Sequence, residues 1–304
     1  MTARVVEATA PCRVDLGGGA PGVTVVLAID RRVFCRVETG IEGVELESKD
    51  ALRKETAPDV ARIAASGSLG LAAHVLRALG LERGVRVSTH SGLPEGTGLG
   101  DPTALAVALT GAVAAALGRE LSPDAIVRLA QGAARGGAAE DDGAGAHAAV
   151  RGGVIAVEHE PQEVRVVPLG VDPARIEECL MLVDAGAAPS VAVPPSPDPA
   201  GLVPAALAEG RFEDVVDLWA EEWASRERLV PGWPPPEAGR LAAVVRAAGG
   251  AARLCGAGRG RVLAVWAPPG ARGPGRREAV QGALRAAGVR PFAARVDLRG
   301  LEVE

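Results

Sequence analysis

Hydrophobic and polar residues alternate along two long stretches near the start of the chain. Residues 5–16 and 23–38 are rich in β-branched side chains and are separated by three glycines at 17–19. This pattern predicts two neighbouring strands, because successive side chains of a strand point to opposite faces. Shorter stretches of similar character predict further strands at 44–47, 84–90, 152–158, 164–169, 179–186, 251–255, 262–267 and 292–298.

Stretches with helical spacing of apolar residues lie between these strands. They predict helices at 58–80, 101–118, 122–135, 204–229 with a break at Gly210, 236–248 and 275–287. Ser122 and Pro123 suit the N-cap and first turn of the third helix. The order of elements indicates an α+β fold with mixed sheets, because it lacks the regular alternation of a doubly wound nucleotide-binding fold. The proline-rich stretch 188–204 is the predicted linker and divides the chain into domains 1–187 and 188–304.

Composition excludes several classes of protein. The chain has 304 residues, of which 48% are hydrophobic and 23% charged, which is enough for a buried core and excludes a disordered or fibrous chain. Aromatic residues make up only 2%, and the net charge is −5, so nucleic-acid binding is disfavoured. The four cysteines are far apart and form no zinc or disulfide pattern. With no long apolar run and no signal segment, we expect a cytoplasmic protein without a membrane partner.

The strongest chemical feature is the segment PEGTGLGDPTALAVAL, residues 94–109. A predicted strand leads into a glycine-rich turn that opens onto a helix N-terminus, where free N–H groups and the helix dipole favour a phosphate. The glycines fit neither a P-loop nor a dinucleotide-binding fingerprint. A second interpretation is a plain turn with a well-capped helix, in which Asp101 is the N-cap and Pro102 the first helical residue.

Three segments together resemble the GHMP kinase superfamily, which includes galactokinase and homoserine, mevalonate and phosphomevalonate kinases. They are APCRVDLGGG at 10–19 (the first motif), the segment at 94–109 (the second motif) and LCGAGRGRVLAVW at 254–266 (the third motif). They occur in the order and spacing of the superfamily, and the likeness is greatest to its sugar and heptose kinase branch. The resemblance implies a two-domain α+β fold with a ribosomal-protein-like N-terminal domain and a ferredoxin-like C-terminal domain.

The resemblance also implies a function, namely ATP-dependent phosphorylation of a small, sugar-like metabolite at a hydroxyl group, with Mg²⁺ as a second cofactor. The implied partner is this small-molecule substrate, and a homodimer is left open. The implied ATP-binding residues are Gly96, Thr97, Gly98, Leu99, Gly100, Asp101 and Thr103, of which Asp101 and Thr103 would also contact the metal. The implied substrate-binding residues are Arg13, Asp15, Gly256, Gly258 and Arg259. The only lysines are Lys49 and Lys54, so phosphate charge would be met by backbone amides, Mg²⁺ and arginine.

The chain departs from the superfamily at its second and third motifs. Asp101 and Pro102 stand where relatives have serines. Asp101 would either cap the helix, so that its carboxylate fills the anion site, or hold Mg²⁺, and the cap is favoured. Arg259 and Arg261 stand within the glycines of the third motif, where they would either bind phosphate or point to solvent. The loop after Gly19 is shorter than in the sugar kinases, which puts sugar specificity in doubt.

The general base of the superfamily is also displaced. Counted back from Gly152, its position falls on Gly145, and the nearest acids are Glu140, Asp141 and Asp142. A small gap in the alignment would make Asp142 or Asp141 the catalytic residue, whereas without it these acids form a solvated turn. Two functions follow from these departures. The chain is expected to be an active kinase or, alternatively, a catalytically impaired GHMP-fold protein retained for binding or as a scaffold.

Overall fold

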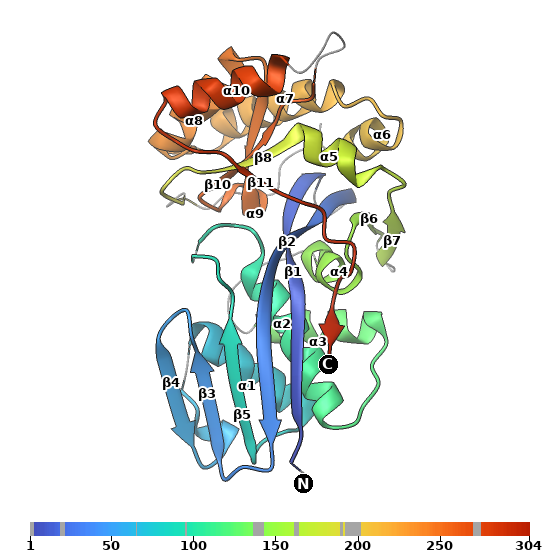
Figure 1. The fold of residues 1–304 in the computed structure, drawn as a ribbon, viewed down its shortest axis with the longest axis vertical. Coiled ribbons are helices and arrows are strands. Elements are labelled where there is room, and N and C mark those ends of the chain that lie inside the picture. The colour runs from blue at the N-terminus through green and yellow to red at the C-terminus, as the bar shows by residue number, and fades with distance from the viewer. Residues whose placement is uncertain are drawn as a thin grey trace.

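The computed structural model describes residues 3–18, 22–64, 66–94, 96–135, 143–160, 164–188, 191, 202–269 and 275–304. Two β-sheets with their helices lie one above the other in an elongated molecule (Figure 1). The first sheet is in the lower half and carries the N-terminal strands, and the smaller second sheet is in the upper half.

The first sheet has the strand order β12-β1-β2-β5-β3-β4, and β6 extends it by pairing with β2 and β7. Its pairings are antiparallel except for the parallel pair β3 and β5. Helix α2 packs against β1 and β2 and is flanked by α1, α3 and α4. The elements are β1 (Val5–Gly18), β2 (Gly22–Thr39), β3 (Val44–Ser48), β4 (Arg53–Ala57), the 3₁₀ turn η1 (Val60–Arg62), α1 (Gly67–Leu79), β5 (Val85–His90), α2 (Asp101–Ala116), α3 (Pro123–Arg135), α4 (Ala144–Arg151), β6 (Val154–His159), β7 (Val164–Pro168) and β12 (Glu302–Val303).

The second sheet has the strand order β11-β8-β10-β9 and is antiparallel. Its strands are β8 (Leu180–Asp184), β9 (Ala251–Leu254), β10 (Val262–Trp266) and β11 (Phe292–Ala293). The helices around it are α5 (Pro173–Cys179), α6 (Val203–Ala208), α7 (Asp214–Leu229), α8 (Pro236–Ala247), the single turn α9 (Cys255–Gly258) and α10 (Gly275–Ala286).

The two faces of the second sheet belong to different hydrophobic cores. On β8, Leu180 and Leu182 face the large core that is shared with the first sheet, whereas Met181 and Val183 face a smaller core beneath α8 and α10. This division follows from the alternation of side chains along a strand. Because the larger core runs from β1 and α2 to β8 and β10, the two halves of the molecule are packed together rather than merely linked.

The C-terminal segment returns from the second sheet to the first (Figure 1). Its strand β12 pairs with β1, while β8, which precedes residue 188, pairs with β10. The buried side chain of Arg32 on β2 holds this segment through Asp297, at 2.5 Å, and Glu302, at 2.9 Å. The division into domains 1–187 and 188–304 stays a prediction, and most of the expected linker lies outside the described residues.

Most of the expected elements are confirmed, including the β1–β2 pair, the hairpin of β6 and β7, and α3 with Ser122 accepting a hydrogen bond from the N–H of Ala125. The single helix expected at 58–80 is wrong. The side chain of Asp59 accepts from the N–H of Arg62 and caps the separate 3₁₀ turn, and α1 begins only at Gly67. The strand expected at 292–298 is shorter, and β4 and β12 were not expected.

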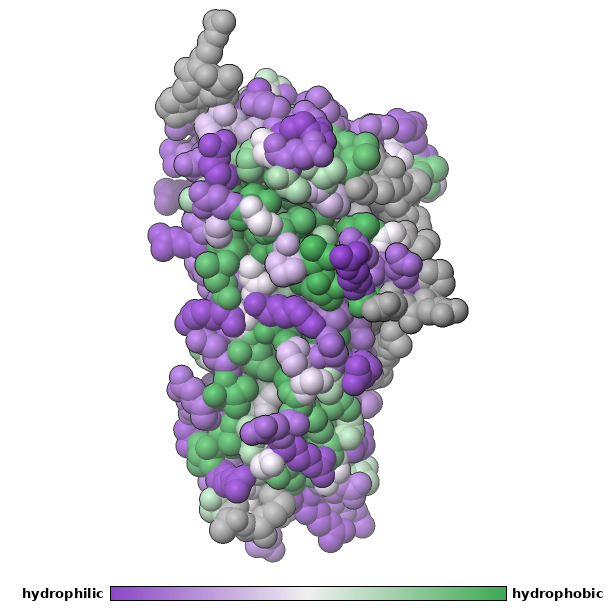
Figure 2. All heavy atoms as spheres, turned by 90° about the vertical axis from the view of Figure 1, so that its right-hand side faces the viewer, coloured by the Kyte–Doolittle hydropathy of each residue, from purple (hydrophilic) through white to green (hydrophobic). Residues whose placement is uncertain are grey.

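The surface on one side of the molecule is mixed in character. Figure 2 shows hydrophilic and hydrophobic side chains interspersed over both halves of this face. Among the helices of the described residues, none is both long and apolar enough to span a membrane.

Candidate functional site

The glycines of the second and third motifs meet backbone to backbone. A Cβ atom on Gly98 would lie 2.7 Å from the Cα of Gly260 and 2.8 Å from the carbonyl oxygen of Cys255. A Cβ atom on Gly256 would in turn lie 2.9 Å from the Cα of Gly98. No real side chain fits at such distances, so glycine is required here for close approach of the two loops.

The glycine loop, residues 96–100, is held by hydrogen bonds to its carbonyl groups. Arg261 and Val262 of the third motif donate their N–H groups to the carbonyls of Gly96 and Thr97, at 2.9 and 3.1 Å. Arg13 of the first motif donates its N–H to the carbonyl of Leu99 at 2.7 Å. The carbonyls of Gly96, Thr97 and Leu99 are therefore all bound within the protein. Within the described part of the chain, the amides of Gly98 and Gly100 make no hydrogen bond, so they are donors available to an anion.

The expected capping of α2 by Asp101 is wrong. The N-cap residue is Gly100, with φ of 85°, and no side chain caps the helix. Asp101 is instead the first residue of α2, and its carboxylate accepts a hydrogen bond from its own backbone N–H. Its Oδ1 accepts a hydrogen bond from the Cys12 thiol at 3.3 Å, and its Oδ2 accepts one from the Ser91 hydroxyl at 3.2 Å. These contacts, made by residues from β1 and from the end of β5, determine where the carboxylate points.

Asp101 has an unusual electrostatic environment. Burial raises the pKa of its carboxyl group, and the hydrogen bonds from Cys12 and Ser91 offset only part of this. Burial and the nearby carboxylate likewise raise the pKa of the Cys12 thiol, which therefore stays protonated and donates. None of the ion pairs among the described residues involves Asp101, so its negative charge is met by neutral donors alone. A cation would relieve this charge.

Asp50 orders the chain just before the glycine loop. Its carboxylate accepts hydrogen bonds from the N–H groups of Ser91 and Gly92, at 2.7 and 3.2 Å, and pairs with His90 at 2.8 Å. Burial would raise the pKa of Asp50, but the backbone hydrogen bonds outweigh burial and the pKa is lowered. Ser91 is thereby held where its hydroxyl can reach Asp101.

The first motif contributes an ion pair next to the glycine loop. Nε of Arg13 lies 2.9 Å from Oδ1 of Asp15, and both side chains are largely buried. The Arg13 side chain also fills the space beside two glycines: a Cβ atom would lie 2.2 Å from it at Gly100 and 2.7 Å from it at Gly145. A guanidinium group therefore lies between the start of α2 and the start of α4.

The expected catalytic residues Asp141 and Asp142 lie outside the described residues. Gly145, the position reached by counting without a gap, is in the first turn of α4 and faces Arg13. An acidic side chain at position 145 would contact the guanidinium of Arg13. Because residue 145 is glycine, the Arg13 side chain fills that space instead.

The remaining predicted site residues fall around the same centre. Thr103 is buried in the first turn of α2, Gly256 and Gly258 lie in α9, and Arg259 is exposed at the end of that turn. Arg261 pairs with Asp184 at 2.8 Å on the second sheet. The structure thus brings the three motifs together, while the roles assigned to their residues stay predictions. No group of three or more potential metal ligands occurs in the described ranges.

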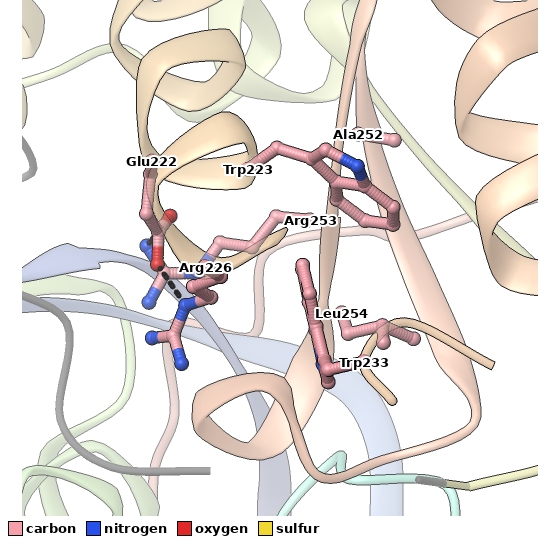
Figure 3. Close-up of a pocket in the computed structure, with 7 residues that line it drawn as sticks. All are labelled: Glu222, Trp223, Arg226, Trp233, Ala252, Arg253 and Leu254. Atoms are coloured by element: carbon pink, nitrogen blue, oxygen red, sulfur yellow. Dashed lines mark hydrogen bonds and ion pairs between the residues drawn. The ribbon is translucent and has the colours of Figure 1, made fainter. Parts of the chain in front are cut away.

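Sequence reasoning missed a buried group of charges on α7 and β9. Nε of Arg226 donates to Oε1 of Glu222 at 2.9 Å, and a terminal nitrogen of Arg253 lies 2.9 Å from Oε2 of Glu222 (Figure 3). Trp219, on the same face of α7, donates its indole N–H to the carbonyl of Leu16 in the first motif at 2.7 Å. The spacing of Trp219, Glu222 and Arg226 along one helix face was the available signal.

Two packed sheets that meet at a glycine loop and a helix N-terminus are an arrangement suited to binding an anion. A family model, the GHMP kinases N terminal domain, matches residues 66–153. Mevalonate kinase of Thermococcus sibiricus is 34% identical over 146 residues, and the match covers 41% of this chain and 43% of that protein, less than half of each.

Solved structures extend the likeness to nearly the whole chain. A D-glycero-D-manno-heptose 1-phosphate kinase from Bacteroides thetaiotaomicron matches with a TM-score of 0.77 and 20% identity over 98% of both chains. Galactokinase from Lactococcus lactis matches with a TM-score of 0.73 and 13% identity over 99% of this chain and 95% of that one. The chain therefore contains a segment similar to the N-terminal domain of GHMP kinases, at residues 66–153, and has the two-domain α+β fold of these kinases.

Proposed function

We propose that this protein is a kinase that transfers a phosphoryl group from MgATP to a hydroxyl group of a small, sugar-like metabolite. The observation that carries the proposal is the state of the glycine loop. Its carbonyls are held by Arg13, Arg261 and Val262, and its amides at Gly98 and Gly100 are left as donors beside a helix N-terminus. Fixed donors of this kind suit phosphoryl transfer, in which catalysis is mainly positioning and charge stabilisation.

Asp101 is the proposed ligand of Mg²⁺. Its carboxylate lies at the start of α2, is largely buried and, among the described residues, accepts hydrogen bonds only from neutral donors: the Cys12 thiol, the Ser91 hydroxyl and its own backbone N–H. Mg²⁺ in kinases commonly takes one or two protein carboxylates together with substrate phosphates, so a larger protein cluster is not needed. We propose that the hydroxyl of the neighbouring Thr103 also faces the metal. When bound, MgATP supplies the phosphoryl group that is transferred.

The other residues have positioning and proton-transfer roles in this proposal. Arg13, held by Asp15, places a positive charge between the start of α2 and the start of α4, where it would stabilise charge on the transferred group. Asp142, or Asp141 beside it, would accept the proton of the acceptor hydroxyl. The acceptor class follows the names of the similar proteins, whose substrates, a heptose phosphate, galactose and mevalonate, all carry hydroxyl groups.

A second candidate is a catalytically impaired protein of the same fold. The observation that favours it is Gly145, which has no carboxylate and leaves its place to the Arg13 side chain. Such a protein would bind a nucleotide or a metabolite without turning it over.

Calorimetric titration of the unaltered protein tests the proposal. We expect binding of MgATP, and weaker binding of ATP in the presence of EDTA. The ratio of the affinity for MgATP to the affinity for free ATP should be at least about tenfold smaller in the variant Asp101→Asn, because a group that binds the metal has been lost. Formation of ADP that depends on both MgATP and a sugar acceptor would favour the kinase over the impaired protein. Absence of any MgATP binding would contradict the proposal.

A further inference from the structure

The support behind Asp101 begins at the ends of two parallel strands. β3 and β5 run in the same direction, so their carboxyl ends lie at the same edge of the first sheet. β3 ends at Ser48 and β5 at His90, and the N–H of Lys49 donates to the carbonyl of Thr89 at 3.0 Å. The turn that follows β3 therefore lies beside the chain that leads from β5 to the glycine loop.

Asp50, in the turn after β3, joins the two strand ends. Its Oδ2 accepts a hydrogen bond from the N–H of Ser91 at 2.7 Å, and its Oδ1 accepts one from the N–H of Gly92 at 3.2 Å. Both donors belong to the backbone, so the carboxylate fixes the path of the chain after β5. The side chain of His90, the third partner, is 51% exposed, and an ion pair so exposed is weak.

Ser91 carries this support to Asp101. Its hydroxyl accepts a hydrogen bond from the N–H of Leu93 at 3.1 Å and has one proton to donate. Two acceptors are within reach of that proton: the carbonyl of Leu93 at 3.3 Å and Oδ2 of Asp101 at 3.2 Å. The carboxylate is the stronger acceptor because it is charged.

The carboxylate of Asp101 is held at both oxygens. Cys12 binds Oδ1 and Ser91 binds Oδ2, so rotation of the group would break at least one of these hydrogen bonds. A carboxylate has about four lone-pair sites, so these donors and its own N–H leave room for a cation. Partners that orient a metal ligand in this way matter for affinity, and their loss typically weakens metal binding about 10–100-fold.

The turn that carries Asp50 has a strained backbone. In the part of the chain that the structure describes, Leu52 alone among residues other than glycine has a positive φ, of 49°. This left-handed conformation disfavours a bulky side chain. Leu52 is 92% exposed, so its own packing does not hold it there. Such strain persists where surrounding contacts impose it, and Asp50 supplies two contacts to the chain after β5.

We propose that Asp50 is a positioning residue of the metal site: through Ser91 it fixes the direction in which the carboxylate of Asp101 meets the Mg²⁺ of MgATP. The inference rests on the proposed kinase function and adds the turn between β3 and β4 to its site. Asp50 does not touch the metal. The alternative is that Asp50 only stabilises the turn, so that its loss lowers stability and leaves the metal dependence of nucleotide binding unchanged.

Calorimetric titration of Asp50→Ala with MgATP, and with ATP in the presence of EDTA, tests this role. The ratio of the affinity for MgATP to the affinity for free ATP should be about tenfold smaller than in the unaltered protein. Asp50→Asn, which keeps one acceptor oxygen, should lower this ratio less. When Asp50→Ala is added to Ser91→Ala, the ratio should not fall further, because the hydroxyl that carries the support is already lost.

Asp59→Ala is the matched control. The carboxylate of Asp59 also accepts a hydrogen bond from a backbone N–H, that of Arg62, and pairs with a cation, Arg83. These partners take no part in holding Asp101. Asp59→Ala should lower the free energy of unfolding in urea, as Asp50→Ala does, but leave the ratio of affinities unchanged. If the ratio falls equally in both variants, the effect is one of stability in general and the positioning role is overturned.

The outcomes separate this inference from the proposed function. If the unaltered protein binds MgATP and Asp50→Ala keeps the same ratio, the positioning role is overturned and the kinase stands. If no MgATP binds, the kinase fails, and urea unfolding of Asp50→Ala, Asp101→Asn and the double variant decides the role of Asp50. The unfolding equilibrium constant of the double variant should then differ by about fivefold from that expected for independent effects. Independent effects would overturn the inference.

Discussion

The thiol of Cys12 donates a hydrogen bond to the carboxylate of Asp101 across 89 residues of sequence, with Sγ and Oδ1 3.3 Å apart. This contact joins the middle of β1 to the first residue of α2. With the hydroxyl of Ser91 and its own backbone N–H, it fixes the carboxylate at the first turn of a helix that has no side-chain cap. The start of α2 therefore carries a carboxylate whose negative charge a bound cation would offset.

The first prediction concerns the pH dependence that Asp101 gives to stability. The pKa of Asp101 is raised in the folded protein, chiefly by burial, above its ordinary value of about 3.9. Below that value the group is protonated in both the folded and unfolded states and costs nothing. As pH rises through the folded-state pKa, the group ionises at a cost, and its contribution to stability is lost.

Asp101→Asn removes this ionisation and should therefore raise the free energy of unfolding at pH 7 in the absence of nucleotide. The gain over the unaltered protein should shrink as pH is lowered toward the ordinary Asp value. Urea denaturation of both proteins across this pH range measures the difference. A variant that is less stable at pH 7, with a difference independent of pH, would contradict the burial of an ionised Asp101.

The second prediction concerns the contact between the glycine loop and the third motif. In Gly98→Ala the new Cβ would lie 2.7 Å from the Cα of Gly260, an approach that backbone atoms cannot yield to cheaply. The free energy of unfolding should fall by about 2–4 kcal/mol. Overpacking accounts for about 1–3 kcal/mol of this, and placing alanine in a left-handed backbone conformation accounts for about 1 kcal/mol.

Gly96→Ala is the matched control for this experiment. Gly96 has nearly the same backbone conformation, with φ of 77° against 80° at Gly98, but no heavy atom of the described residues, its chain neighbours apart, lies within 4 Å of the added Cβ. The free energy of unfolding of Gly96→Ala should fall by only about 1 kcal/mol. Denaturant unfolding compares the two variants, and equal losses would mean that the loops do not touch as described.

The third prediction concerns the attachment of the C-terminal segment to the first sheet. Asp297→Asn removes the charge that Arg32 meets at 2.5 Å, where both side chains are nearly inaccessible. The buried guanidinium of Arg32 would then face a neutral amide, so the free energy of unfolding should fall by about 3 kcal/mol. Glu302→Gln changes the other carboxylate paired with Arg32, whose side chain is 39% exposed, and should lower the free energy of unfolding by less than about 1 kcal/mol. Urea unfolding measures both, and a smaller loss in Asp297→Asn would contradict the anchoring role of the buried pair.

The parts of the fold that could be predicted from sequence are those with a local pattern. The alternation in β1 and β2 and the glycine spacing at 96–100 are visible in the residues themselves. β4 was missed because its side chains are mostly exposed at the sheet edge and have no apolar alternation. β12 was missed because only two residues pair, and their partners in β1 are almost 300 residues away.

The site was predicted less well because side-chain direction depends on distant contacts. Asp101 is a favoured N-cap residue, but the N-cap is Gly100, and the Asp101 carboxylate is held by Cys12 of β1 and by Ser91, which follows β5. Arg253 stands in an otherwise apolar strand, so the sequence around it indicates burial but does not identify Glu222 as its partner. In both cases the missing information is a contact between residues far apart in sequence.

The fourth prediction concerns Trp219, which joins α7 to the first motif. Trp219→Phe leaves the buried carbonyl of Leu16 without its donor, which should cost about 2 kcal/mol. Trp266→Phe is the comparison, because Trp266 is also fully buried, donates to the carbonyl of Phe212 and packs its ring against that of Trp219, with centroids 5.8 Å apart. The two variants should lose similar stability in urea unfolding. A loss of stability confined to Trp266→Phe would contradict this role of Trp219, because the carbonyl of Leu16 would then not depend on an indole N–H of α7 for its hydrogen bond.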